Sequence, residues 1–282
     1  MRPVVLAWLA RHGLPSFLLL DYFQLAAVAC VLGSMLALRQ TARDGGSRVH
    51  AARAIACAYV GALVGGYLFE ALREIPAALA FGGWHPITHA GRAAYGGLLF
   101  AIVAAAAYLK LARLPLGPFF DSVSVGTGLT FTLVRTGCFL AGCDYGVPTA
   151  LPWGVRFPPG SLAAVDHARR GLVPFGAASL PVHPTQLYEA ALGAVAAGVA
   201  ALVLRRSRRR DGRAFAAFLL VYACGRFLIE LLRGDHDRGH ALGLSTSQWV
   251  SLAIVVALAA LAAAALRSRQ GEGGGFAASA RA

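Results

Sequence analysis

The sequence predicts an all-α integral membrane protein with about seven transmembrane helices and a folded loop after the fourth. Two observations on composition lead to this fold class: 57% of the 282 residues are hydrophobic and only 14% are charged. An ordinary soluble domain carries roughly 25% charged residues, so this composition excludes a soluble globule. The third observation is that apolar runs of about 20 residues, the length that crosses a bilayer as a helix, recur along the chain.

Each run is justified in turn by its length and by the polar residues that end it. The predicted spans cover about residues 17–38, 54–71, 93–109, 119–140, 186–204, 214–232 and 247–266. The third span is the shortest and opens with Gly91 and Arg92, so its limits are the least sharply defined. Together with their connections, the spans form one membrane domain over residues 1–270.

Basic residues set the predicted orientation. The chain has 26 Lys and Arg against 13 Asp and Glu, a formal net charge of +13. The segments after the first, third, fifth and seventh spans together carry 15 Lys and Arg, against 9 on the opposite side. Cytoplasmic loops carry such an excess. We therefore expect the N-terminus outside and the C-terminus in the cytoplasm. Because orientation accounts for the basic charge, we expect no nucleic-acid partner.

Two segments outside the spans differ in character. Residues 142–184 contain dispersed prolines together with apolar residues such as Trp153, Val155 and Phe157. This segment is too apolar for a solvated linker, so we expect it to fold on the outer membrane face as a periplasmic cap. Residues 271–282, GEGGGFAASARA, predict a disordered tail.

Ionisable residues within spans are costly in a bilayer and are therefore candidates for function. Arg135 lies near the end of the fourth span. Arg226, Glu230 and Arg233 follow one another at helical spacing in the sixth, which places them on one face. Two arginines at a similar depth would form a fork for phosphate oxygens. The alternative is an internal ion pair with Arg233 extending to the interface.

Two further segments place polar or small residues at the start of a span. One side of the fifth span would be lined at its start by His183, Gln186 and Glu189, which recur every three residues. The alternative is that this segment only caps the helix, where the positive end of the helix dipole stabilises the negative charge of Glu189. Gly96 and Gly97 open the third span, and such a glycine pair by itself is more often a close contact between helices than a ligand site.

Taken together, these segments resemble the prolipoprotein diacylglyceryl transferase family of the bacterial inner membrane. The similarity runs from about Tyr22 to the seventh span in the same order and spacing. The segments that carry it are Ala94–Leu99, Arg135–Phe139, Gly142–Gly146, Pro152–Pro158, His183–Glu189, Arg226–Arg233 and Leu244–Trp249.

The resemblance implies a reaction and a set of site residues. Family members transfer the diacylglyceryl group of phosphatidylglycerol to the lipobox cysteine thiol of a lipoprotein precursor, without a cofactor or metal. Arg135 and Arg226 match the two essential arginines, which would hold the phosphate, and Tyr95 occupies a catalytic position. The resemblance assigns substrate binding to Tyr22, Gly96, Gly97, Gly146, His183, Gln186, Glu230 and Arg233.

The chain departs from the family pattern at three positions. Tyr95 stands where the family has a histidine, and a tyrosine of pKa about 10 is a poor base unless an arginine lowers it. Tyr95 or one of three nearby histidines would have to take that role: His85, His89 or His183. Cys138 and Cys143 replace an asparagine and a glutamate, and they are either two inert thiols or a pair near the oxidising face.

These departures leave other functions open. The enzyme could use another acceptor or lipid headgroup, or the chain could be a non-catalytic lipid-binding relative. A transporter is less favoured because the charged residues gather near one leaflet and no inverted repeat is visible. A thiol oxidoreductase has only the five-residue spacing of Cys138 and Cys143 in its support.

Overall fold

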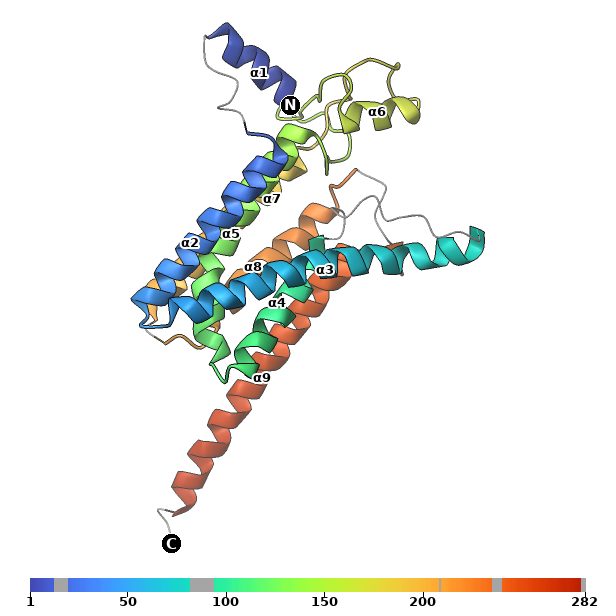
Figure 1. The fold of residues 1–282 in the computed structure, drawn as a ribbon. Helices are drawn as coiled ribbons and strands as arrows, with labels where there is room; N and C mark the ends of the chain where they lie inside the picture. The colour runs from blue at the N-terminus through green and yellow to red at the C-terminus, as the bar shows by residue number, and fades with distance from the viewer. Residues whose placement is uncertain (13–19, 82–93, 208, 235–239, 280–282) are drawn as a thin grey trace.

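The computed structural model describes residues 1–12, 20–81, 94–207, 209–234 and 240–279, and it is helical almost throughout (Figure 1). The helices are α1 (Arg2–Arg11), α2 (Tyr22–Arg43), α3 (Arg48–Phe81), α4 (Ala94–Leu111), α5 (Leu116–Ala141), α6 (Leu162–Arg169), α7 (Thr185–Arg206), α8 (Arg213–Glu230) and α9 (Thr246–Ser279). Two short strands, β1 (His240–Ala241) and β2 (Leu244–Ser245), pair antiparallel before α9.

The all-helical prediction is confirmed, and each predicted span coincides with a long helix. Within the described residues, five helices could cross a membrane by length and composition: α2, the first part of α3 (Arg48–Phe69), α5, α7 and the first part of α9 (Thr246–Ala265). Helix α4 contains a shorter apolar stretch, Gly96–Leu111. Helix α8 carries Arg226 and Glu230 in its last turns. Large apolar side chains cover the outer surface, as Leu63 and Leu261 illustrate, and this suits contact with lipid.

Several elements differ from the expectation. Helices α1 and α6 were not predicted, and α3 continues to Phe81, ten residues beyond the expected end of its span. Helix α9 runs on to Ser279, where the sequence predicts a disordered tail from residue 271. An existing helix adds residues without a new nucleation step, so a long apolar helix readily extends into a polar end.

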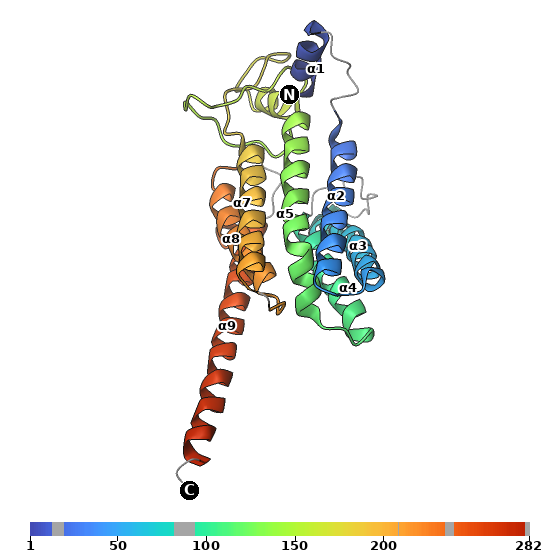
Figure 2. The ribbon, with the colours of Figure 1, turned by 90° about the vertical axis from the view of Figure 1, so that its left-hand side faces the viewer.

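Helix α5 lies between α2 and α7, as Figure 2 shows, and α3 packs on α4 as a second pair. Small residues allow the close approach of α2 and α5. A Cβ atom added to Gly126 would lie 2.3 Å from the carbonyl oxygen of Gly33, and one added to Gly33 would lie 2.8 Å from that of Gly126. Membrane helices commonly pack through such small residues because their backbones can then touch.

Substituting Gly126 with alanine is expected to destabilise the protein by about 1–3 kcal/mol, because the new methyl group meets rigid backbone on α2. The matched control is Gly198→Ala on α7, where nothing lies within 4 Å of the added atom. Alanine favours a helix over glycine, so the control should keep or raise the thermal midpoint measured in detergent. Equal midpoints for the two variants would contradict this account of the α2–α5 contact.

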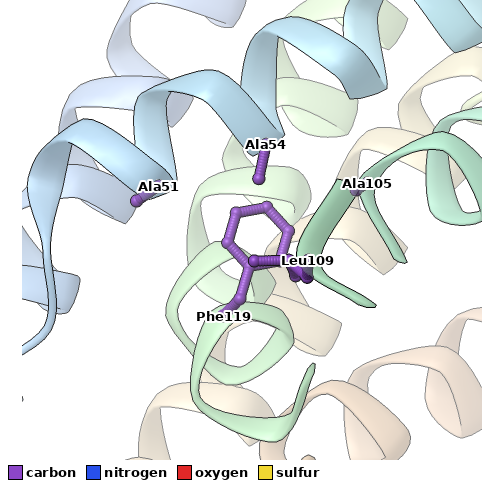
Figure 3. Packing of buried hydrophobic residues seen from close by; sticks show 5 residues of the cluster. All are labelled: Ala51, Ala54, Ala105, Leu109 and Phe119. Atoms are coloured by element: carbon purple, nitrogen blue, oxygen red, sulfur yellow. The ribbon is translucent and has the colours of Figure 1, made fainter. Parts of the chain in front are cut away.

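Alanines play a similar part where α3, α4 and α5 meet. Figure 3 shows the ring of Phe119 beneath Ala54 and beside Leu109, with Ala51 and Ala105 on the neighbouring helices. At the same end of the molecule, the buried carboxylate of Asp121 accepts hydrogen bonds from the backbone N–H groups at the start of α8, at 2.8–3.1 Å. This anion caps the helix N-terminus and ties α8 to α5.

Residues 142–184 fold into a compact cap that contains α6, at the opposite end from the C-terminus (Figure 1). Phe157 and Val182 are fully buried in it, and single β-bridges join Val182 to Pro148 and Val155. The amino group of Met1 donates to the carbonyl of Leu140 at 3.0 Å and fixes α1 at the same end. The segment is therefore ordered by its own core, and the side of the membrane that it faces remains a prediction.

Candidate active site

Three arginines and three carboxylates converge where α5, α7 and α8 meet the cap. We call this group the Arg–carboxylate cluster. It consists of Arg135 on α5, Asp144 just after α5, Glu189 on α7, Arg226 and Glu230 on α8, and Arg233 just after α8. The formal charges cancel, as expected for ionised groups that are largely withdrawn from water.

Glu189 is the centre of the cluster and is fully buried. Its Oε2 atom lies 2.6 Å from Nε of Arg135. Its Oε1 atom lies 3.3 Å from Nη1 of Arg233 and 3.8 Å from Nε of Arg226. One carboxylate thus holds three guanidinium groups that come from two different helices and a connecting segment. A position one turn into α7 allows this, because it points the side chain inward between α5 and α8.

Asp144 forms the outer edge of the cluster. Its Oδ2 atom lies 2.7 Å from Nη1 of Arg135, and its Oδ1 atom lies 2.6 Å from Nη2 of Arg233. Its side chain is 28% exposed, against 0% for Glu189 and 1% for Glu230. Burial works to raise the pKa of Asp144, but Arg233 and Arg135 together hold that pKa well below its ordinary value. Asp144 is therefore ionised at any physiological pH.

Arg226 is the least exposed arginine of the cluster, with 4% of its side chain accessible. It pairs with Glu230 one helical turn away, and its Nη2 atom donates to the hydroxyl of Ser247 at 3.2 Å. A capping box sets the start of α9: Ser245 accepts from the backbone N–H of Gln248 at 3.2 Å, and the Gln248 side chain accepts from the Ser245 N–H at 2.9 Å. The Ser–Thr–Ser–Gln segment of the sequence therefore has a local role, which is to present Ser247 to Arg226.

Gly146 brings three segments close enough to position Arg233. It forms a β-bridge with Arg233 and donates its N–H to the carbonyl of His183 at 3.0 Å. A Cβ atom here would lie 2.6 Å from His183 and 2.8 Å from the Leu232 carbonyl. Any larger residue would push the segment after α8 away from the cap.

Thr185 and Gln186 hold the segment that carries Asp144. The hydroxyl of Thr185 donates to the carbonyl of Asp144 at 2.6 Å, and the Gln186 side-chain amide donates to the carbonyl of Cys143 at 2.5 Å. Both side chains are fully buried in the first turn of α7. The start of α7 thus fixes the backbone from which the outer carboxylate extends.

The structure brings most of the predicted site residues together. Arg135, Arg226, Glu230, Arg233, Gly146 and Gln186 all belong to the cluster or to its immediate supports. The interpretation of Arg233 as a side chain that extends to the interface is wrong, because it is 5% exposed and paired with two carboxylates.

Other predicted residues have different positions. Tyr22 starts α2, and its ring faces Gly137, two residues after Arg135. His183 contributes backbone contacts to Gly146, while its ring nitrogen lies 3.2 Å from the Tyr188 hydroxyl. Gly96 and Gly97 face α3, where added Cβ atoms would meet Phe69, Gly65 and Ala62, and Gly97 also lines a cavity among α2, α3, α4 and α5. The side chain of Tyr95 lies outside the described residues, as do His85 and His89 entirely.

The sequence reasoning missed the roles of Asp144 and Glu189. Both stood within segments already singled out, but neither was assigned to the site. The signal that could have found them is charge balance, because three arginines with one carboxylate would leave uncompensated buried charge.

Cys138 and Cys143 are two separate thiols, and no disulfide joins them. The Cys143 thiol donates to the carbonyl of Cys138 at 3.7 Å. The two sulfurs and a carboxylate oxygen of Asp144 lie within 4.8 Å of one another, a spacing that could suit a metal ion. The donor set fits a cation poorly, because Asp144 already binds two guanidinium groups and the thiols would have to ionise.

Cys143 is expected to react slowly with a thiol reagent in the folded protein. Its hydrogen bond with Cys138 and its burial raise the pKa of the Cys143 thiol, so little thiolate exists at pH 8. Site-resolved mass spectrometry after alkylation should show a native rate far below that in the SDS-unfolded protein, still rising with pH beyond pH 9. A native rate that matches the unfolded one, or levels off near pH 8.5, would count against this environment.

Fold and site together describe a bundle of long apolar helices in which buried arginines pair with carboxylates at one end. Comparison with known sequences then gives the family. A family model described as prolipoprotein diacylglyceryl transferase matches residues 14–264, so the chain belongs to that family, as the resemblance in its motifs predicted.

Individual relatives agree with this assignment. A protein of Paenarthrobacter aurescens named phosphatidylglycerol–prolipoprotein diacylglyceryl transferase is 30% identical over 85% of this chain and 76% of its own length. One of Clostridium tetani with the same name is 33% identical over 57% of this chain. The aligned regions cover 59% of the Clostridium tetani protein and 47% of a Clostridium perfringens relative, so the match spans about half the length of these two.

Proposed function

We propose that this protein transfers the diacylglyceryl group of phosphatidylglycerol to the lipobox cysteine thiol of a lipoprotein precursor. The observation that carries the proposal is the convergence of Arg135, Arg226 and Arg233 in a chain that belongs to this family. The names of its relatives supply the donor and acceptor. The arginines supply what the chemistry needs, which is a fixed positive site for a departing phosphate.

The reaction requires two changes of charge. The acceptor thiol loses its proton, and its sulfur forms a bond to the terminal glyceryl carbon of the lipid. The bond from that carbon to the phosphate oxygen breaks, and its electron pair leaves with the glycerol phosphate anion. Arg135 and Arg233 reach the outer edge of the cluster, where they would bind the phosphate oxygens as planar forks. For the thiol proton we propose Tyr95, in the position of the family histidine.

A cavity supports lipid as the substrate class. It has a volume of about 370 Å³ and lies among α2, α3, α4 and α5, with apolar walls that include Ile55, Leu98, Ile102, Phe119 and Phe131. The α5 residues in its wall, Phe119 to Phe131, precede Arg135 by about 6–24 Å along the helix axis. An acyl chain that starts from a headgroup at Arg135 would run along this depth.

We further propose seven spans in a bacterial inner membrane, with the N-terminus and the cap outside and the C-terminus in the cytoplasm. The exposed basic residues support this orientation. The turns that join α2 to α3, α4 to α5 and α7 to α8 lie at the end opposite α6 (Figure 1). The exposed arginines in these turns and at the adjoining helix ends are Arg43, Arg48, Arg113, Arg205 and Arg206. The cluster would then face the side on which lipoprotein precursors present their cysteine.

The test is reconstitution of the full chain with phosphatidylglycerol and a lipobox peptide, followed by mass spectrometry. The expected product is the peptide with a thioether-linked diacylglyceryl group. The control is an active family member in the same vesicles. The absence of product from this protein, where the control gives product, would reject the proposal.

A second candidate is transfer to another acceptor or from another headgroup, and the replacement of the family histidine by Tyr95 is the observation that favours it. Lipid and protein profiling of a deletion strain separates the two. Unmodified lipoprotein precursors support the first function. Normal lipoproteins together with another altered lipid or modified protein support the second.

A further inference from the structure

We propose that Asp144 is a specificity-determining residue that acts as a displaceable internal anion: its carboxylate holds Arg135 and Arg233 until a lipid phosphate exchanges with it. The inference deepens the proposed function, since it takes the ligand to be an anionic phospholipid headgroup. It concerns binding alone and does not require that transfer follow.

The contacts of Asp144 are those that a bound phosphate would make. Its two oxygens each accept from a different guanidinium group, at 2.7 Å from Arg135 and 2.6 Å from Arg233. Phosphate oxygens accept charge-assisted hydrogen bonds from guanidinium N–H groups in the same way. A headgroup that binds these arginines must therefore meet the Asp144 carboxylate in the same place.

The exposed fractions of the three carboxylate side chains indicate which of them can leave its arginines. The side chain of Asp144 is 28% exposed, whereas those of Glu189 and Glu230 are 0% and 1% exposed. Releasing a buried carboxylate would strand its charge away from water, at a cost of several kcal/mol. Asp144 can turn toward solvent and regain hydration, so it is the member of the cluster suited to exchange.

Charge balance requires that one anion leave the cluster when a phosphate binds. With three arginines and three carboxylates, the cluster is neutral, and an added phosphate would give a buried site a net negative charge. Exchange of one anion for another keeps the balance. A zwitterionic headgroup brings no net negative charge and would displace Asp144 less well, so the residue would favour anionic lipids over zwitterionic ones.

The backbone conformation at Asp144 indicates that the fold itself directs this carboxylate toward Arg135 and Arg233. Asp144 has φ of +58°, a left-handed conformation that costs energy in a residue other than glycine. Thr185 and Gln186 hold this conformation through the carbonyls of Asp144 and Cys143. The carboxylate is thus aimed at the two arginines by a backbone that can stay in place when the side chain rotates away.

The decisive variant is Asp144→Asn, which removes the charge and keeps the size. Binding of short-chain phosphatidylglycerol to the full chain in detergent is measured by calorimetry, beside phosphatidylcholine with the same acyl chains. We expect the variant to bind phosphatidylglycerol at least about tenfold more tightly, because the competing anion is gone. The control, Asp211→Asn, removes an exposed carboxylate beside Arg213 and should leave the affinity unchanged.

A purely structural role for Asp144 predicts the opposite sign. If the carboxylate only orients Arg135 and Arg233, Asp144→Asn weakens binding or leaves it unchanged, and either result overturns the inference. If neither protein binds phosphatidylglycerol, the inference also fails. Transfer activity is a separate readout, since an inactive wild type whose lipid affinity still rises in the variant would reject only the proposed function.

A second measurement uses the unaltered protein and does not depend on how the variant folds. A water-soluble carbodiimide with an amine labels accessible carboxylates, and mass spectrometry reports the modification of Asp144. Exchange predicts that phosphatidylglycerol increases this labelling, whereas phosphatidylcholine does not. Unchanged or reduced labelling with phosphatidylglycerol would overturn the inference.

Discussion

Arg135→Ala is expected to lower kcat/KM for diacylglyceryl transfer by about 10²–10³-fold or more, the usual effect of losing one charged donor at a departing anion. Arg135 contacts both the fully buried carboxylate of Glu189, at 2.6 Å, and the most exposed carboxylate of the cluster, Asp144, at 2.7 Å, as Arg233 also does at longer distance from Glu189. Its removal takes away a phosphate ligand and leaves both carboxylates short of a partner.

The comparison with Arg135→Lys separates charge from shape. A lysine keeps the positive charge, but it cannot reach two carboxylates as a planar fork, so we expect most of the activity to be lost as well. The control is Arg170→Ala in the cap, an exposed side chain that pairs with Asp166 at 3.4 Å. Product formation in vesicles is the measurement, and near-normal activity in either Arg135 variant would refute the assigned role.

Glu189→Gln is expected to destabilise the protein by about 3–5 kcal/mol, the cost of leaving buried charges without their partner. Glu189 is fully buried and faces three guanidinium groups, so a neutral amide leaves a net positive charge in the interior. The thermal midpoint in detergent should fall sharply, and the variant should also lose transfer activity because Arg135 is no longer held.

Asp211→Asn is the matched control for stability. Asp211 pairs with Arg213 at 3.1 Å, but both side chains are well exposed, and an exposed pair contributes about 0–1 kcal/mol. A Glu189→Gln midpoint close to that of this control would show that the cluster is not held together by its central carboxylate.

Local patterns in the sequence were enough to predict the helices and part of the site. Hydropathy located each long helix because burial in lipid acts on every residue of a span independently of its neighbours in space. Helical periodicity placed Arg226 and Glu230 one turn apart on the same face, and the structure confirms their ion pair. The cost of a charge in a bilayer singled out Arg135, and the three-residue spacing in the fifth span singled out Gln186. Family motifs added Gly146, and all three residues lie at the cluster.

Contacts between distant segments of the chain decided the remaining features, which are the surroundings of the glycine pair and the ends of the long helices. The sequence could not name the partner of Gly96 and Gly97, because α3 reaches them only through the tertiary fold. Nor could the ends of helices be located from apolar content alone, because α3 and α9 continue past the residues that lipid would cover.

By itself, the sequence determined that this protein is a bundle of long apolar helices with arginines within them. Only the tertiary structure showed that Asp144 and Glu189 complete the site. Arg233 pairs with Glu189 across 44 residues and with Asp144 across 89. Such pairing depends on where α5, α7 and α8 come together, because a buried charge selects its partner by distance in space and not by position along the chain.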